Sequence, residues 1–307
     1  MTPPRSNSAP DLPPMAIPEA LLTAWRAEET GPAQGWDFSA LAGRVEESPV
    51  PWDLDDLYRE RLAGARSVLD LGTGGGEHLL RFVDLLPPDT IATEGWEPNV
   101  PIARAALAGH GIELVAFAQP DDAADPAPMP FPDARFDLVL NRHESYHPVE
   151  VARVLRPGGY FLTQQVDGRE FGEVRGAFGL GPHAPGVTYR VLREGLLGAG
   201  LEIVDGAESV GHYAFADIAA LVAYLQLIPW EAPADFTVDR YAQALHSLHQ
   251  RGPARGEPLL VERRRFWLLA RKPAGPGPAP GATANPASRA ATDPPKPAPA
   301  PAPAEDD

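Results

Sequence analysis

A glycine-rich turn after an apolar stretch is the part of this sequence with the clearest chemistry. Residues 67–71 (Ser-Val-Leu-Asp-Leu) indicate a buried strand, and Gly-Thr-Gly-Gly-Gly follows directly. A helix is predicted to begin at Glu77. A strand that leads through such a turn into a helix can bind a nucleotide-like cofactor, because the turn presents backbone N–H groups with few side chains in the way. A plain tight turn that caps the helix is the alternative interpretation.

The glycine spacing separates two kinds of cofactor. The dinucleotide pattern G-x-G-x-x-G would need a glycine where this chain has Glu77. Asp70 lies two residues before the first glycine of the turn. S-adenosylmethionine (SAM) has no phosphate, but it carries a sulfonium cation and an ammonium group, for which a carboxylate is a suitable partner. The sequence therefore favours SAM over NAD. The cofactor-binding residues predicted from this turn are Asp70, Gly72, Thr73, Gly74, Gly75 and Gly76.

Polar residues also end the following expected strands. Glu94 ends the second strand, where a carboxylate can accept hydrogen bonds from both ribose hydroxyls. A solvated acid at a strand end is the alternative for Glu94. Asp125 follows the third strand and could accept a hydrogen bond from the adenine amino group. The further cofactor-binding residues predicted here are Glu94, Gly95, Trp96, Asp125 and Asn141.

The stretch His143-Glu144-Ser145-Tyr146-His147 allows more than one chemistry. It matches the H-E-x-x-H pattern of zinc metalloproteases, whose two histidines bind the metal from one helix. A strand runs into the motif and Pro148 follows it, so a continuous helix is not expected and no metal site is predicted. The alternative is general-base catalysis by His143, because histidine titrates near neutral pH. Glu144 and His147 are the other catalytic candidates, and a non-catalytic loop histidine stays open.

The order of the surrounding elements supplies a scaffold for these residues. Short apolar stretches alternate with helix-like stretches between residues 67 and 166, which is typical of a parallel sheet with helices on both faces. Ligands of such doubly wound α/β sheets bind beyond the carboxyl ends of the strands. Strands are expected at residues 67–71, 90–96, 112–118, 136–141, 160–166, 201–208 and 265–271, and helices at 101–108, 149–155 and 189–199.

The amino-acid composition of the chain disfavours several classes of function. The 307 residues carry a formal net charge of −16, and an acidic chain repels phosphate backbones, so a nucleic-acid substrate is not favoured. The absence of cysteine excludes disulfides, cysteine–zinc sites and a thiol nucleophile, and it fits a cytoplasmic protein. No apolar stretch is long enough to span a membrane, and the N-terminus lacks the apolar core of a signal peptide.

Several segments together resemble a known family. The chain is similar to class I SAM-dependent methyltransferases with a type-11 methyltransferase domain. The resemblance implies a Rossmann-like sheet of seven mostly parallel strands with an antiparallel last strand, and SAM as methyl donor. The family usually has Ala after the acid placed at Asp125, where this chain has Pro126, so Asp121 or Asp122 could take that role. The segments that carry the likeness are residues 68–76 (VLDLGTGGG), 92–96 (ATEGW), 129–133 (MPFPD), 136–140 (FDLVL) and 154–159 (VLRPGG).

The resemblance implies a methyltransferase that acts on a small-molecule acceptor. A methyltransferase of ribosomal or transfer RNA bases, and a SAM-binding protein without transferase activity, are the alternatives. The sequence does not predict the acceptor, the methylated atom or the oligomeric state.

The folded part is expected to cover residues 16–272. Residues 1–15 are rich in Pro and Ser, and residues 273–307 are mostly Pro, Ala and Gly, a composition that predicts disorder. Residues 18–58 contain three tryptophans and are expected to form an N-terminal cap, and residues 212–255 match the place of the family's substrate lid.

Single residues of the cap and lid have two interpretations each. Arg44 of the cap could pair with the methionine carboxylate of SAM or be an exposed arginine. Tyr213, Phe215 and Trp230 of the lid could line an apolar pocket or pack in a core.

Overall fold

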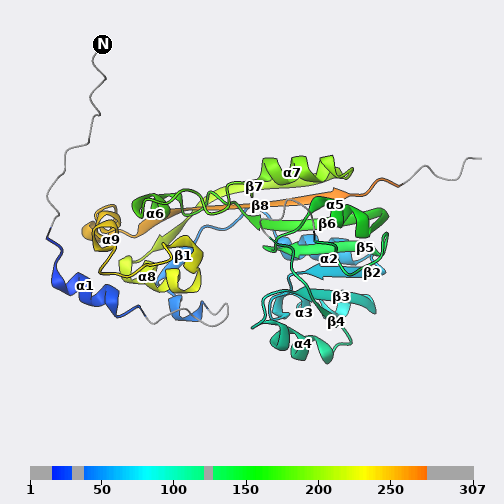
Figure 1. The fold of residues 1–307 in the computed structure, drawn as a ribbon, viewed down its shortest axis with the longest axis horizontal. Coiled ribbons are helices and arrows are strands. Elements are labelled where there is room, and N and C mark those ends of the chain that lie inside the picture. Colours follow the sequence, from blue (N-terminus) through cyan, green and yellow to red (C-terminus); the bar gives the residue numbers. More distant parts are fainter. Residues whose placement is uncertain (1–15, 30–37, 121–126, 275–307) are drawn as a thin grey trace, which may run out of the picture. The chain divides into compact units, whose positions relative to one another are not determined.

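The computed structural model describes residues 16–29, 38–120 and 127–274. Within them, eight strands form one sheet in the order β1-β7-β8-β6-β5-β2-β3-β4 (Figure 1). The strands are β1 (Val45–Glu47), β2 (Ser67–Leu71), β3 (Asp89–Glu94), β4 (Glu113–Ala116), β5 (Phe136–Arg142), β6 (Leu155–Val166), β7 (Glu202–Phe215) and β8 (Leu259–Arg271). The α-helices are α1 (Glu19–Arg26), α2 (Leu54–Leu62), α3 (Glu77–Leu80), α4 (Val100–Ala108), α5 (Pro148–Val154), α6 (Gly172–Ala177), α7 (Tyr189–Gly198), α8 (Ile218–Leu227) and α9 (Ala242–His249).

The predicted doubly wound sheet is confirmed. Strands β4, β3, β2, β5 and β6 are parallel, whereas β8 pairs antiparallel with both β6 and β7. All five residues of β2 are buried, as expected for a central parallel strand that is covered on both faces. Helices α5 and α7 pack on one face, and α2 packs on the other.

The expected number of seven strands is one too low. The additional strand β1 lies in the segment that we expected to be a cap, and it pairs antiparallel with the end of β7, with Val45 opposite Phe215. A three-residue strand with one half-buried and two exposed positions has no apolar alternation to reveal it. Residues 45–47 form a strand only because they pair with β7.

Strands β7 and β8 are longer than the sequence pattern predicted. They pair from Glu202 opposite Arg271 to Phe215 opposite Leu259, and Figure 1 shows both continuing past β6 toward α6, α8 and α9. The missed part of β8, residues 259–264, contains the polar run Glu262-Arg263-Arg264, which breaks the apolar signal of a strand. This extension lies beyond Val166, at the carboxyl edge of β6.

A second apolar core forms on the extension of β7 and β8. Trp25 of α1 and the buried residues of α8 pack there with Tyr213 and Phe215. These two aromatic residues are at most 1% exposed and belong to β7, so of their two interpretations core packing is correct. Trp230 is 41% exposed. The segment inserted between the two strands accordingly begins after Phe215, later than the predicted lid.

The remaining expectations concern Arg44, the two ends of the chain and membrane spans. Arg44 is paired with Glu28 at 2.8 Å, so it does not offer a free guanidinium to a cofactor. The segments 1–15 and 275–307, expected to be disordered, lie outside the described residues, as does Trp36. In the described part, no helix is long and apolar enough to cross a membrane.

Candidate active site

The glycine turn after β2 owes its shape to backbone conformations that favour glycine. Gly72, Gly74 and Gly76 have φ angles of +67°, +64° and +93°. A Cβ atom on Gly72 would also lie 2.4 Å from the Cβ of Glu144, so the turn and the loop after β5 are in direct contact. The positive φ angles therefore explain why positions 72, 74 and 76 are glycines.

Glu94 ties the ends of β2 and β3 together. Its carboxylate accepts hydrogen bonds from the backbone N–H groups of Gly74 and Trp96, each at 2.7 Å. The N–H of Thr73 donates to the carbonyl of Thr93 at 2.8 Å. Each carboxylate oxygen has a second lone pair. The buried Glu94 is thus held in one orientation and can still accept hydrogen bonds from a ribose.

The residues after Glu94 lie at the same strand end. Gly95 packs against β4's continuation so closely that a Cβ atom there would lie 2.1 Å from the Cβ of Ala118. Trp96 is 45% exposed. Asp125 and its alternatives Asp121 and Asp122 lie outside the described residues.

Asp70 is a buried acid at the carboxyl end of β2. Burial raises its pKa to about 7, and the Glu94 charge adds to this, whereas the Thr73 hydroxyl and Arg142 oppose it. Among the described residues, the buried hydroxyl of Tyr58, on which the Asp70 charge acts, has no hydrogen-bond partner. A buried carboxylate beside an unsatisfied hydroxyl fits a polar, cationic ligand group such as the ammonium of SAM.

Asn141 supports the loop after β5 from within. Its side chain is fully buried, and its oxygen accepts hydrogen bonds from Thr163 and Gln165 at 2.9 and 2.6 Å. Its amide nitrogen donates to the carbonyl of Glu144 at 3.0 Å. These bonds anchor the loop that carries the predicted catalytic residues.

His143 begins this loop in a strained conformation. Its φ is +68°, and its backbone N–H donates to the carbonyl of Gln164 at 2.9 Å. The residue is exposed to solvent, and its Nε2 lies 3.5 Å from the side-chain nitrogen of Gln164. Desolvation by neighbouring groups and the positive charges of three arginines hold the pKa of His143 well below its usual value, so the imidazole is neutral at physiological pH.

The H-E-x-x-H residues do not share a helix. Helix α5 begins at Pro148, after the motif, and the Nδ1 of His147 accepts a hydrogen bond from the N–H of Val149 at 3.3 Å. His147 therefore caps α5. The geometry required of a metalloprotease helix is not present at this place, in agreement with the expectation from Pro148.

Sequence reasoning did not single out Arg142. This exposed residue ends β5, and its charge acts on Asp70, His78 and His143. In the described part of the chain, no hydrogen bond or ion pair involves its guanidinium. A cation directly after Asn141, at a strand end that faces the crevice, was the signal that could have revealed it.

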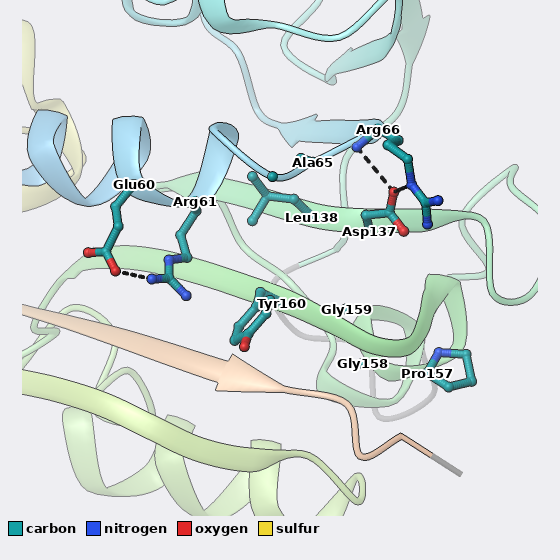
Figure 2. A pocket seen from close by; sticks show the side chains of 11 residues that line it. Glu60, Arg61, Ala65, Arg66, Asp137, Leu138, Pro157, Gly158, Gly159 and Tyr160 are labelled. Atoms are coloured by element: carbon teal, nitrogen blue, oxygen red, sulfur yellow. Dashed lines mark hydrogen bonds and ion pairs between the residues drawn. The ribbon is translucent and has the colours of Figure 1, made fainter. Parts of the chain in front are cut away.

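A cavity lies at the amino ends of the central strands, on the opposite side of the sheet's length from the glycine turn. The cavity has a volume of about 400 Å³ and is lined in part by Arg61, Arg66, Asp137 and Tyr160. Figure 2 shows these side chains around it. Arg66 precedes β2 and Asp137 is near the start of β5, so the cavity is at the amino ends of these strands. Asp70 and Arg142 are at the carboxyl ends, and the cavity is therefore separate from the crevice described above.

Comparison with known proteins agrees with this geometry. Residues 69–163 match the family model described as a methyltransferase domain. A crystal structure of a candidate methyltransferase from Bacillus halodurans C-125 has a TM-score of 0.50 and 19% identity, and the match covers 72% of this chain and 100% of that one. At this identity the likeness shows the fold alone.

Two curated proteins are similar over part of their length. A fatty-acid O-methyltransferase of Mycolicibacterium smegmatis is 38% identical over 117 residues, which is 34% of this chain and 40% of that protein. An uncharacterized methyltransferase of Bacillus subtilis is 32% identical over 102 residues, which is 31% of this chain and 38% of that protein. The chain thus spans less than half of the length of these relatives. Domains of this family use SAM as methyl donor.

Proposed function

Because residues 69–163 form a SAM-dependent methyltransferase domain, we propose that this protein transfers a methyl group from SAM to a small-molecule acceptor. The observation that carries the proposal is the arrangement around the glycine turn. Asp70 and Glu94 lie at the ends of neighbouring strands, and Glu94 holds the backbone of Gly74. The turn between them has left-handed backbone at Gly72, Gly74 and Gly76, which glycine adopts without strain.

Different residues of the chain would bind different parts of SAM. Glu94 would accept hydrogen bonds from the ribose hydroxyls, and the exposed ring of Trp96 would lie beside the adenine. Asp70 would pair with the ammonium group, which returns the buried carboxyl to its ionised form. SAM supplies an electrophilic methyl on a good leaving group, so alignment of acceptor and methyl is the main task of the protein.

The acceptor would reach the methyl from the side of the loop after β5. His143 and Glu144 lie on this loop, and Glu144 contacts Gly72 of the cofactor turn. The fatty-acid O-methyltransferase among the relatives supports a small-molecule acceptor. The formal charge of −16 supports it as well, since it disfavours a nucleic-acid acceptor.

Calorimetric titration with SAM tests this proposal. We expect binding in the micromolar range for the full chain, and a loss of at least about 10-fold in affinity for Glu94→Gln, which removes a charged hydrogen-bond acceptor. Glu202→Gln serves as control, because Glu202 is an exposed residue at the amino end of β7. Absence of SAM binding by the folded wild-type chain would refute the proposed function.

A further inference from the structure

Three arginines surround His143, and they come from two strands. Arg142 ends β5 opposite Gln164 of β6, and Arg265 of β8 is opposite Val166 of β6. Because side chains alternate along a strand, Arg142, Gln164 and the two arginines at 263 and 265 are on the same face of the sheet. The same face carries α2 and the residues that precede it, since the Trp52 indole N–H donates to the Gln164 side-chain oxygen at 2.8 Å.

Two of these arginines are balanced by acids and one is not. Arg265 is paired with Glu170 and donates to the Tyr213 hydroxyl, and Arg263 lies 3.1 Å from the Glu47 carboxylate. Arg142 has no such partner among the described residues. Although the acids Asp70 and Glu144 lie nearby, Arg142 is the guanidinium beside His143 that no acid of the described residues pairs with, so it is left for a ligand.

This environment selects among methyl acceptors. A neutral hydroxyl needs a general base, but the surroundings of His143 keep the imidazole a weak base. An amine is cationic in its common form at neutral pH and would be repelled by the arginines. A carboxylic acid, with an ordinary pKa of about 4, is already ionised and needs no base. An unpaired guanidinium beside a weak base thus fits a carboxylate.

We propose that the acceptor is a carboxylic acid, bound through its carboxylate by Arg142, with the neutral imidazole of His143 as a hydrogen-bond donor beside it. This rests on the proposed methyltransferase function. A carboxylate oxygen lone pair attacks the methyl carbon, the carbon–sulfur bond breaks, and its electron pair stays on sulfur. The products are a methyl ester and S-adenosylhomocysteine. The carboxylate charge and the sulfonium charge cancel, and no proton is transferred.

The test compares acceptors that differ only in the head group. Octanoic, dodecanoic and hexadecanoic acids, the matching alcohols and the matching amines are each incubated with the full chain and SAM carrying a labelled methyl group. We expect labelled ester from at least one acid and no product from its alcohol or amine. Product from an alcohol or amine alone, or SAM binding without ester from any acid, would overturn the carboxylate proposal and leave the proposed function intact. Failure to bind SAM would refute the proposed function itself.

Variants at Arg142 test how the acid is held. Arg142→Gln is expected to raise the KM for the acid about 10- to 100-fold at saturating SAM, the range for a lost charge-assisted hydrogen bond. The Kd for SAM is measured separately, because the Arg142 charge also lowers the pKa of Asp70, and its loss would weaken SAM binding near neutral pH. Arg142→Lys should recover part of both losses. Arg104→Gln, which removes an exposed charge from α4, is the matched control and should behave like wild type. An unchanged KM for the acid at saturating SAM in Arg142→Gln would show that Arg142 does not bind the acceptor.

Discussion

The ionisation of Asp70 should couple SAM binding to pH. In the free protein, burial raises the pKa of this carboxyl to about 7, so near neutral pH about half of the molecules carry it protonated. The ammonium group of SAM would pair with the ionised form only. Below pH 7 binding must therefore first remove the proton from Asp70, and the observed affinity is expected to fall.

The size of the effect follows from the fraction of Asp70 that is protonated. With a pKa of about 7, the observed Kd equals the intrinsic Kd multiplied by about 2 at pH 7, by about 11 at pH 6 and by about 100 at pH 5. The expected increase in Kd is about 50-fold between pH 7 and pH 5, with a slope near tenfold per pH unit at the acid end. The α-amino group of SAM stays protonated over this interval, so it adds no trend of its own.

Calorimetry of SAM binding at half-unit pH steps measures this slope. Asp70→Asn, which cannot ionise, should bind SAM more weakly than wild type at pH 7 and show a nearly flat profile. The second control is 5′-methylthioadenosine, which lacks the amino-acid end of SAM and should bind wild type without the steep slope. A Kd for SAM that is independent of pH in wild type, or an equal slope in Asp70→Asn, would refute the pairing of Asp70 with the ammonium group.

Three further predictions concern stability and the loops. The pKa of Asp70 in the folded protein lies above its unfolded value of 3.8, so ionisation of Asp70 lowers the free energy of unfolding as pH rises from about 4 to 7. In urea unfolding, Asp70→Asn should therefore be more stable than wild type at pH 8, by at most about 4 kcal/mol. At pH 3.5 the two proteins should be equally stable. Gly72→Ala should abolish calorimetric SAM binding, whereas Gly109→Ala, with open space for a methyl group, should not. His147→Ala should lower the free energy of unfolding by about 1 kcal/mol through its lost helix cap and keep SAM binding, and unchanged stability would contradict the capping role.

Local sequence patterns were sufficient for the central part of the fold. Parallel strands that are covered on both faces are mostly apolar, and β2 and β5 show this in Val68, Leu69 and Leu71 and in residues 138–140. The turn after β2 needs left-handed backbone at Gly72, Gly74 and Gly76, and glycine is the residue that adopts it without cost. Because these signals lie within a few residues of each other, the fold, the cofactor turn and the position of Glu94 could be predicted without tertiary information.

The extension of β7 and β8 could not be predicted in this way. Its polar arginine run becomes a strand only because β7 pairs with it over its whole length. Tyr213 and Phe215 similarly became core residues because α1, which is distant in sequence, packs with them and with α8. Pairing and packing between distant segments leave little trace in a local pattern.

The sequence by itself determined a doubly wound sheet, a turn suited to SAM and an acid at each of two strand ends, since each of these depends on residues that are neighbours in the chain. The tertiary structure decided the chemistry next to the turn. It raised the pKa of Asp70 by burial and placed His143 among Arg142, Arg263 and Arg265. The charges around His143 come from strands about 120 residues apart in the chain, and only folding brings those strands together.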